Sequence, residues 1–320
     1  SLDSIGTAKL PSDTSPQSTA QNNQFDWFPK LFGTQRLKEV QDRPAQTLKV
    51  LNEKIFGQKR LTEGLVELQA ASLMNPGKRV FSAVMMGPSG TGKSYSAEEF
   101  AKSVFGSEDY LLRIDGTEYQ QGLSSGLIEI QKLVGAPDGQ QGAQKGMITE
   151  WMKKTGGNGV LLIDEGDKMH PDIWVRLMEL FDRGALTSGS GDRRTANFMY
   201  IIVTTNRGAK DLFPASVQSW TEAEIARRNS TVTTAELKGL YERPLGANDE
   251  KVLPREVINR VDAWLLSSPL SNETVVQIAK DEVERFRSEL WKNGIILNVD
   301  IETIRFLALT NFKATDDGRQ

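Results

Sequence analysis

Five short apolar runs between residues 80 and 266 constrain the fold of this chain more than any other feature. Each run is rich in Val, Ile and Leu and is bounded by turn residues or charges. Near-continuous apolar strands separated by helical stretches are typical of a parallel sheet covered on both faces. The pattern therefore predicts an α/β fold, doubly wound, with a parallel five-stranded sheet. The predicted strands are Val80–Met86, Tyr110–Ile114, Val160–Ile163, Tyr200–Val203 and Ala263–Leu266.

Composition divides the chain into four segments. Residues 1–24 hold thirteen Ser, Thr, Gln or Asn and no aromatic residue, so they are predicted to form a disordered polar tail. Residues 25–44 form an aromatic-rich segment, residues 45–268 the large α/β domain, and residues 269–320 a smaller helical domain. Two roles are open for Phe25–Phe32: it packs on the domain surface, or it is a docking motif for a partner.

The small domain is expected to begin with a long helix. Ser271 offers an N-cap, apolar residues follow at near-helical spacing, and Asn293–Gly294 marks the end. A short strand is predicted at Ile295–Val299 and another helix at Ile301–Leu309. Because the sequence stops at Gln320 directly after a turn, we expect this domain to be incomplete and the chain to be a fragment of something longer.

Composition also excludes several kinds of protein. The net charge is −3, so no basic field indicates nucleic-acid binding, and no run approaches the roughly 18 apolar residues of a membrane span. The absence of cysteine excludes disulfides and thiolate zinc sites and fits a reducing cytoplasm. His170 is the single histidine, which disfavours histidine-based metal sites and triads.

The first apolar strand leads directly into a phosphate-binding loop. The sequence Gly87-Pro88-Ser89-Gly90-Thr91-Gly92-Lys93-Ser94 has the P-loop pattern in the required place after a strand. Glycines let successive backbone N–H groups point at phosphate oxygens, and the following helix adds its positive N-terminal end. We expect Lys93 to neutralise the β- and γ-phosphates of ATP and Ser94 to hold Mg²⁺.

Two later strands end in polar residues that complete this chemistry. Val160–Ile163 is followed by Asp164, a candidate Mg²⁺ ligand, and by Glu165, a candidate general base. Tyr200–Val203 leads to Asn206, whose amide group can orient a water between the γ-phosphate and Glu165. The alternatives are that the two carboxylates cap the next helix and that Asn206 belongs to an ordinary turn.

The order of these motifs resembles the AAA+ superfamily, and within it the Clp-type ring ATPases, particularly the second ATPase module of large bacterial protein-remodelling chaperones. The resemblance implies an AAA+ large domain at 45–268, a lid domain at 269–320, and a hexameric ring with ATP at each subunit interface. The matching stretches are Ile55–Gln58, Leu111–Tyr119, Leu133–Pro137, Leu161–Glu165, Lys168–Asp172, Leu180–Thr187 and Ile258–Asp262.

The resemblance also implies roles for residues that spacing alone does not assign. Arg260 corresponds to the arginine finger that reaches the γ-phosphate of the neighbouring subunit; the alternative is a surface arginine paired with Asp262. Arg319 resembles the lid arginine that senses nucleotide, although it stands in Asp-Gly-Arg where the family usually has Gly-Ala-Arg. His170 is assigned to structure. The predicted nucleotide contacts are Phe56, Gly57, Gly87, Pro88, Ser89, Gly90, Thr91, Gly92, Lys93, Ser94, Tyr95 and Arg319.

One loop departs from the family pattern. Unfoldases of this type carry an aromatic residue that grips polypeptide in a pore loop, and this chain has Gln140–Gln141 there. A second loop, Ser188–Arg194, resembles a pore-facing hairpin and is equally compatible with a solvated glycine hairpin.

Four functions follow from these motifs. The leading one is a Mg²⁺-ATP-driven homo-oligomeric motor that remodels a protein partner or assembly. A nucleotide-controlled assembly module without threading is the second, and it is favoured by Gln140–Gln141 and the long N-terminal tail. A nucleic-acid motor is disfavoured by the acidic balance, and a nucleotide-binding pseudoenzyme is the least favoured because the catalytic residues are present.

Overall fold

The computed structural model describes residues 34–120, 130–137, 145–213, 220–243 and 253–311. Its centre is a five-stranded sheet in which every pair of neighbouring strands is parallel, with the order β2-β3-β6-β1-β7. The strands are β1 (Val80–Met86), β2 (Leu111–Asp115), β3 (Asn158–Asp164), β6 (Phe198–Thr205) and β7 (Ala263–Leu266). The predicted α/β class and five-stranded parallel sheet are confirmed, with strand ends within two residues of the predicted ones.

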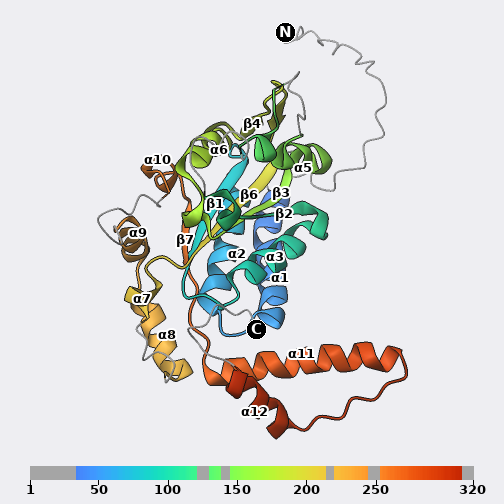
Figure 1. Ribbon diagram of the computed structural model, residues 1–320. Helices are drawn as coiled ribbons and strands as arrows, with labels where there is room; N and C mark the ends of the chain where they lie inside the picture. The colour runs from blue at the N-terminus through green and yellow to red at the C-terminus, as the bar shows by residue number, and fades with distance from the viewer. Residues whose placement is uncertain (1–33, 121–129, 138–144, 214–219, 244–252, 312–320) are drawn as a thin grey trace, which may run out of the picture.

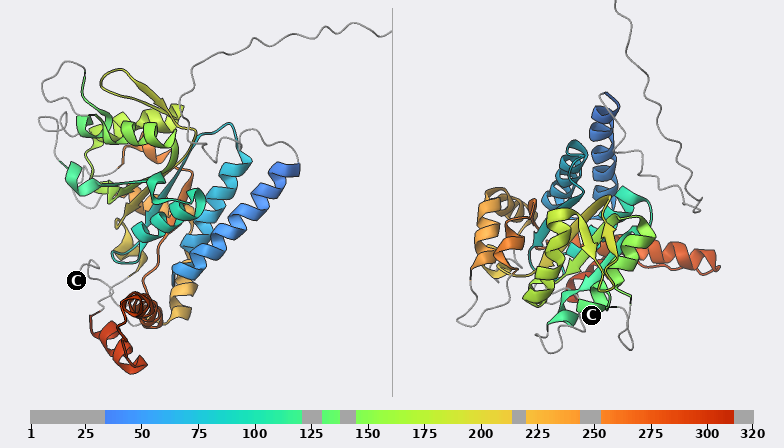
Figure 2. Two further views of the ribbon diagram at one scale, coloured as in Figure 1. Left: turned by 90° about the vertical axis from the view of Figure 1, so that its right-hand side faces the viewer. Right: turned by 90° about the horizontal axis from the view of Figure 1, so that it is seen from above.

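Apolar side chains of each central strand alternate between two hydrophobic cores, which is why the strands are nearly continuous apolar runs. Met199 and Ile201 of β6 lie in the core on one face, and Tyr200 and Ile202 lie in the core on the other. All seven residues of β1 and all eight of β6 are buried. Figure 2 shows α1 and α2 in blue on one side of the sheet and the green helices on the opposite side.

Three helices contribute to the core that contains Tyr200 and Ile202. They are α1 (Thr34–Lys54), α2 (Lys59–Met74) and α3 (Lys93–Phe105). Helix α1 contains Pro44, so it spans the predicted boundary between the aromatic-rich segment and the large domain. The four-segment division of the chain itself stays a prediction.

The second core, around Met199 and Ile201, is covered by helices that follow β2 in the chain (Figure 1). The labelled helical elements from β2 to β7 are η3 (Gly116–Tyr119), α5 (Met147–Thr155), η4 (Gly166–Lys168), α6 (Pro171–Arg183), α7 (Ala209–Leu212), α8 (Glu222–Thr231), α9 (Thr234–Glu242) and α10 (Arg255–Ile258), with η2 (Glu108–Tyr110) just before β2. The described residues 130–134 are helical as well. Strands β4 (Ala185–Thr187) and β5 (Arg193–Thr195) form a separate antiparallel hairpin.

Two further helices, α11 (Asn272–Lys292) and α12 (Ile301–Asn311), lie together at one end of the molecule, below the sheet in Figure 1. The predicted cap is confirmed, because the Ser271 side chain accepts a hydrogen bond from the backbone N–H of Thr274 at 3.1 Å. Asn293 is the C-cap of α11, as predicted. In its apolar stripe Val275 is buried, Ile278, Val283 and Leu290 are half-buried, and Phe286 is 53% exposed.

The strand predicted at Ile295–Val299 is wrong. These residues have no regular structure, and Ile296 is 76% exposed. A strand needs a neighbouring strand to accept its backbone hydrogen bonds. Here the carbonyl groups of Leu297 and Val299 instead accept hydrogen bonds from the Arg287 guanidinium, at 3.1 and 3.3 Å. In the described part of the chain, no helix is both long and apolar enough to cross a membrane.

Candidate functional site

Glycines determine the course of the loop between β1 and α3, as two of them show. A Cβ at Gly87 would lie 2.0 Å from the backbone oxygen of Ser267, so the loop passes directly against the end of β7. Gly92 has a φ of +85°, a conformation that favours glycine, and it immediately precedes the first residue of α3. These two glycines bring the loop backbone over the carboxyl edge of the sheet, where open α/β sheets bind ligands.

Lys93 is buried at this edge, with 8% of its surface exposed. Its Nζ donates hydrogen bonds to the carbonyl oxygens of Gly87 at 2.9 Å and Pro88 at 2.6 Å, and to Oδ1 of Asn206 at 2.7 Å. Burial lowers the pKa of Lys93 to about 8, and the negative charge of Asp164 opposes that shift. The hydrogen-bond partners named here are neutral, so an anionic ligand such as phosphate would stabilise the charged lysine.

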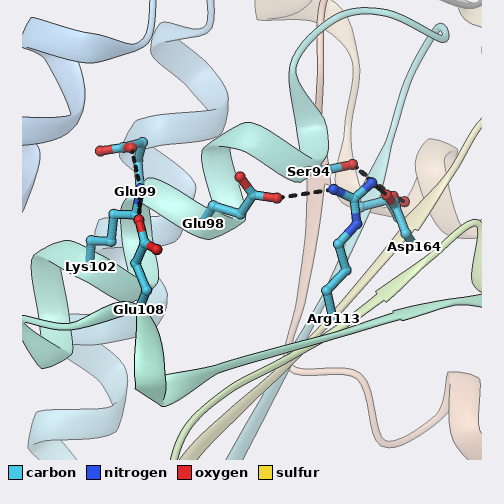
Figure 3. A network of polar contacts seen from close by, with 8 residues as sticks. Ser94, Glu98, Glu99, Lys102, Glu108, Arg113 and Asp164 are labelled. Atoms are coloured by element: carbon cyan, nitrogen blue, oxygen red, sulfur yellow. Dashed lines mark hydrogen bonds and ion pairs between the residues drawn. The ribbon is translucent and has the colours of Figure 1, made fainter. Parts of the chain in front are cut away.

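Asp164 lies at the end of β3 and is also buried. Both of its carboxylate oxygens are 2.8 Å from the Ser94 hydroxyl, and Oδ1 also accepts a short hydrogen bond from Thr204. Nη2 of Arg113 donates to Oδ2 at 2.5 Å (Figure 3). The two predicted Mg²⁺ ligands, Ser94 and Asp164, are therefore brought together, and their hydroxyl and carboxylate oxygens are the ligand types that Mg²⁺ prefers.

Glu165 has an unusual backbone conformation. Its φ of 49° is the only positive value of a non-glycine residue in the described ranges. The conformation is held by a 3.0 Å hydrogen bond from its backbone N–H to the Thr204 hydroxyl. Burial raises the pKa of the Glu165 carboxyl, and the nearby carboxylates of Asp115 and Asp167 raise it further. A raised pKa makes a carboxylate a better proton acceptor, as a general base requires.

The alternative in which the two carboxylates cap the next helix is wrong. The Asp164 oxygens are bonded to side chains, and Glu165 precedes η4 without a capping hydrogen bond. Helix α6 is capped instead by His170, whose ring accepts a 3.3 Å bond from the backbone N–H of Asp172. The structural role expected for His170 is thereby confirmed.

Two adjoining cavities open at this edge of the sheet. The first, of about 580 Å³, is polar, and Lys93, Ser94, Asp164, Glu165 and Asn206 all line it. The second, of about 370 Å³, is lined by Phe56, Tyr95 and apolar residues of the segment 270–278. The loop residues Gly90–Gly92 line both cavities. An apolar cavity for a base beside a polar cavity for phosphates matches the chemistry of a nucleotide.

The remaining predicted nucleotide contacts lie around these cavities. Ser89, Gly90, Thr91, Gly92 and Tyr95 line the polar cavity. Gly87 and Pro88 contribute carbonyl groups to Lys93, as described above, and Gly57 lies against the Thr274 side chain at the start of α11. Arg319, Gln140–Gln141 and Phe25–Phe32 fall outside the described residues. Within those residues, no cluster of three or more His, Cys, Asp or Glu is placed to hold a metal ion.

Arg260 lines neither cavity. Its guanidinium forms an ion pair with Asp182 of α6, and Nη1 donates to the carbonyl oxygen of Glu256 at 2.5 Å. The partner suggested by the alternative interpretation is wrong, because Asp262 instead pairs with Lys78 and accepts a hydrogen bond from the backbone N–H of Ser82 at 2.8 Å. The assignment of Arg260 as a finger remains a proposal.

Three residues that contribute to the site were assigned no role from the sequence. Arg113 and Thr204 bind Asp164, and Gln58 connects the loop to the segment before α11. The buried Gln58 amide donates to the carbonyls of Thr91 at 3.1 Å and Ser268 at 2.7 Å, and it accepts from the Ser268 N–H at 2.9 Å. Two of them had a signal in the sequence: Arg113 is the charged residue in the run Leu111-Leu112-Arg113-Ile114, and Gln58 closes the matching stretch Ile55–Gln58.

Comparison with known proteins shows the family to which this chain belongs. A sequence model of the AAA domain (Cdc48 subfamily) matches residues 78–264, which is more than half of the chain. The chain belongs to this family of AAA+ ATPases.

Its relatives are ClpB chaperones. The chain is 31% identical over 268 residues to the probable chaperone protein ClpB 1 of Chlorobaculum tepidum, a match that covers 82% of this chain and 57% of the relative. It is 29% identical over 269 residues to the chaperone protein ClpB of Vibrio cholerae, covering 82% of this chain and 28% of that protein. The chain thus matches only part of the length of these relatives.

Solved structures show the same fold. The closed-state cryo-EM reconstruction of Hsp104 with ATPγS and FITC casein superposes with a TM-score of 0.67 at 21% identity, over 90% of this chain and 46% of that one. The Saccharomyces cerevisiae Hsp104–ADP complex gives a TM-score of 0.66 at 22% identity, with the same coverage. The recognition of a Clp-type AAA+ ATPase that resembles a ClpB module is confirmed.

Proposed function

We propose that this protein binds Mg²⁺-ATP in the two adjoining cavities and uses its hydrolysis to remodel a protein partner or assembly. The observation that carries the proposal is the convergence of Lys93, Ser94, Asp164, Glu165 and Asn206 on one polar cavity, from the start of α3 and two strand ends. Each supplies a chemical group that phosphoryl transfer to water needs. Family membership supports hydrolysis, and the ClpB relatives support remodelling.

In this proposal the polar side chains have separate tasks. Lys93 binds the β- and γ-phosphates, and Ser94 with Asp164 holds Mg²⁺, which would neutralise charge on the phosphate oxygens. Glu165 accepts a proton from the attacking water, a task suited to its raised pKa. Asn206, whose Oδ1 is fixed by Lys93, orients that water with its amide group.

The adenine base is assigned to the apolar cavity, where Phe56 and Tyr95 would contact it. Gly57 lies beside this cavity, and Arg319 is assigned a nucleotide-sensing role by resemblance alone. A nucleotide bound between the phosphate loop and α11 would contact both, so its binding and release would change the position of α11 and α12. Remodelling would follow from that movement.

A homo-oligomeric ring, proposed as a hexamer, completes the site. Arg260 lies in neither cavity of its own chain and its side chain is 34% exposed, so it is accessible to a neighbouring subunit. A guanidinium supplied from a neighbour would stabilise charge on the γ-phosphate. The similarity to ClpB supports the ring. A cytoplasmic location, which the cysteine-free composition fits, is part of the proposal.

The test separates binding from hydrolysis. Lys93→Ala should lose affinity for a fluorescent ATP analogue, because it removes the phosphate-binding cation. Glu165→Gln should bind the analogue normally and lower ATP turnover by about 10²-fold or more, since it removes only the base. Glu67→Gln, at an exposed position of α2, is the matched control and should leave both quantities unchanged. Retained hydrolysis in both site variants would refute the site.

Remodelling needs a separate measurement. The ATP-dependent unfolding of a tagged test protein should be compared between the wild type and Gln140→Tyr, which restores an aromatic residue at the pore-loop position. Unfolding by the wild type supports threading. If neither protein unfolds the test substrate while ATP is still hydrolysed, a nucleotide-controlled assembly role is supported instead.

A further inference from the structure

Arg113 connects two carboxylates at the polar cavity. It lies in the middle of β2, and its half-exposed side chain reaches across to the end of β3 and to the middle of α3. Nη2 donates to Oδ2 of Asp164 at 2.5 Å, and Nη1 donates to Oε1 of Glu98 at 3.1 Å. Figure 3 shows the guanidinium between these two groups, with Ser94 beside Asp164. One cation is therefore shared by a predicted metal ligand and by a residue of α3 without a role in the proposed reaction.

The oxygens of Asp164 are already well supplied with donors. Oδ1 accepts from Thr204, Oδ2 accepts from Arg113, and both oxygens lie within 2.8 Å of the Ser94 hydroxyl. A carboxylate has about four lone-pair positions for such contacts. Together these contacts surround both oxygens, so a divalent cation, or a water bound to it, competes with one of the three donors for Asp164.

The structure indicates which donor moves. Thr204 is 1% exposed and its hydroxyl also holds the backbone of Glu165, so its position is fixed. Ser94 is itself a proposed metal ligand and stays. Arg113 is 50% exposed, carries a positive charge that repels a metal ion, and has Glu98 as a second partner.

We propose that Arg113 is a built-in competitor of Mg²⁺ for Asp164, and that Glu98 is the partner that draws it away. This inference rests on the proposed function, because it requires Mg²⁺-nucleotide to bind at this site. The pair would then set how strongly nucleotide binding depends on Mg²⁺. Arg113 is a positioning residue here, since it acts on the metal site through Asp164.

Substitution of Arg113 and substitution of its partner Glu98 should change Mg²⁺-dependent nucleotide affinity in opposite directions. The measured quantity is the affinity ratio, which is the Kd of a fluorescent ADP analogue in EDTA divided by its Kd in saturating Mg²⁺. General effects of a substitution on nucleotide affinity cancel in this ratio. Arg113→Gln removes the competitor and should raise the ratio about two- to fivefold, the range for a partly exposed charge pair. Glu98→Gln removes the second partner, leaves Arg113 on Asp164, and should lower the ratio about threefold.

Three further proteins complete the experiment. The double variant Arg113→Gln/Glu98→Gln should behave like Arg113→Gln, because Glu98 acts only through the guanidinium. Arg113→Lys keeps a cation and should stay closer to the wild type. Lys102→Gln is the control. Lys102 lies on α3, as Glu98 does, but it pairs with Glu99 and Glu108, so its removal should leave the ratio unchanged.

The outcomes are distinguishable. A lower ratio in Arg113→Gln would mean that Arg113 prepares Asp164 for the metal, and it would overturn the proposal. Equal ratios in the wild type, Arg113→Gln and Glu98→Gln would overturn it as well, while leaving the nucleotide site intact. Should Arg113→Gln fail to fold, the sign of the Glu98→Gln effect decides. A wild type that binds no nucleotide with or without Mg²⁺ would refute the proposed function and this inference together.

Discussion

The buried ammonium group of Lys93 should make nucleotide affinity depend on pH. Its pKa is about 8, so about 90% of the molecules carry the charge at pH 7 and about 10% at pH 9. Phosphates bind the charged form, so the contribution of Lys93 to affinity should be constant below pH 7. Between pH 7 and pH 9 it should then fall about tenfold, which corresponds to about 1.4 kcal/mol.

A fluorescence titration with an ADP analogue at pH 7, 8 and 9 measures this change. Lys93→Arg is the matched control, because a guanidinium stays charged throughout this range. Its affinity should be independent of pH, whatever its absolute value. A wild-type affinity that is the same at pH 7 and pH 9, or a decline of equal size in Lys93→Arg, would refute the assignment of the pH effect to Lys93.

The stability of the nucleotide-free protein gives an independent check with the opposite direction. Folding lowers the pKa of Lys93 from 10.5 to about 8, so between these values the unfolded chain binds more protons than the folded chain. The free energy of unfolding should therefore rise with pH across this window, by at most about 3 kcal/mol. Urea unfolding should show this contribution in the wild type and not in Lys93→Met.

Two further predictions concern residues outside the polar cavity. Arg260→Ala should leave nucleotide affinity unchanged and lower turnover about 10³-fold or more, and wild-type turnover per chain should rise with protein concentration as rings assemble. A rate that does not depend on concentration would contradict the trans assignment. Gln58→Leu should lower the free energy of unfolding by about 2–4 kcal/mol, because it leaves the buried Thr91 carbonyl and both backbone groups of Ser268 without their partner. Urea unfolding measures this loss, and a change below about 0.5 kcal/mol would show that water or other groups replace the amide.

The large domain could be predicted from the sequence because its strands are buried on both faces. Residues such as Tyr200 and Ile201 point to opposite cores, so no polar residue interrupts the run and the strand is easily seen. The proximity of Lys93, Asp164 and Asn206 could be predicted for a related reason. Parallel strands present their carboxyl ends at one edge, so residues that follow different strands meet there.

The partners of charged residues could not be predicted in this way. Arg260 and Asp182 are 78 residues apart, and their contact depends on how α6 packs near α10. Arg113 was visible as a charge within an apolar run, but its bonds to Asp164 and Glu98 depend on the pairing of β2 with β3. The predicted strand at Ile295–Val299 failed because local composition does not report whether a neighbouring strand exists to pair with it.

The amide of Gln58 has a mechanical consequence for the whole molecule. It ties Ser268 to the phosphate loop, and α11 starts at Asn272, so only residues 269–271 are left to act as a hinge. Leu270, within that hinge, is part of the wall of the apolar cavity. With nucleotide bound as proposed, a swing of α11 about this hinge would open the end of the site assigned to the base and leave the contacts of Lys93 unchanged. We therefore expect the base to be released before the phosphates.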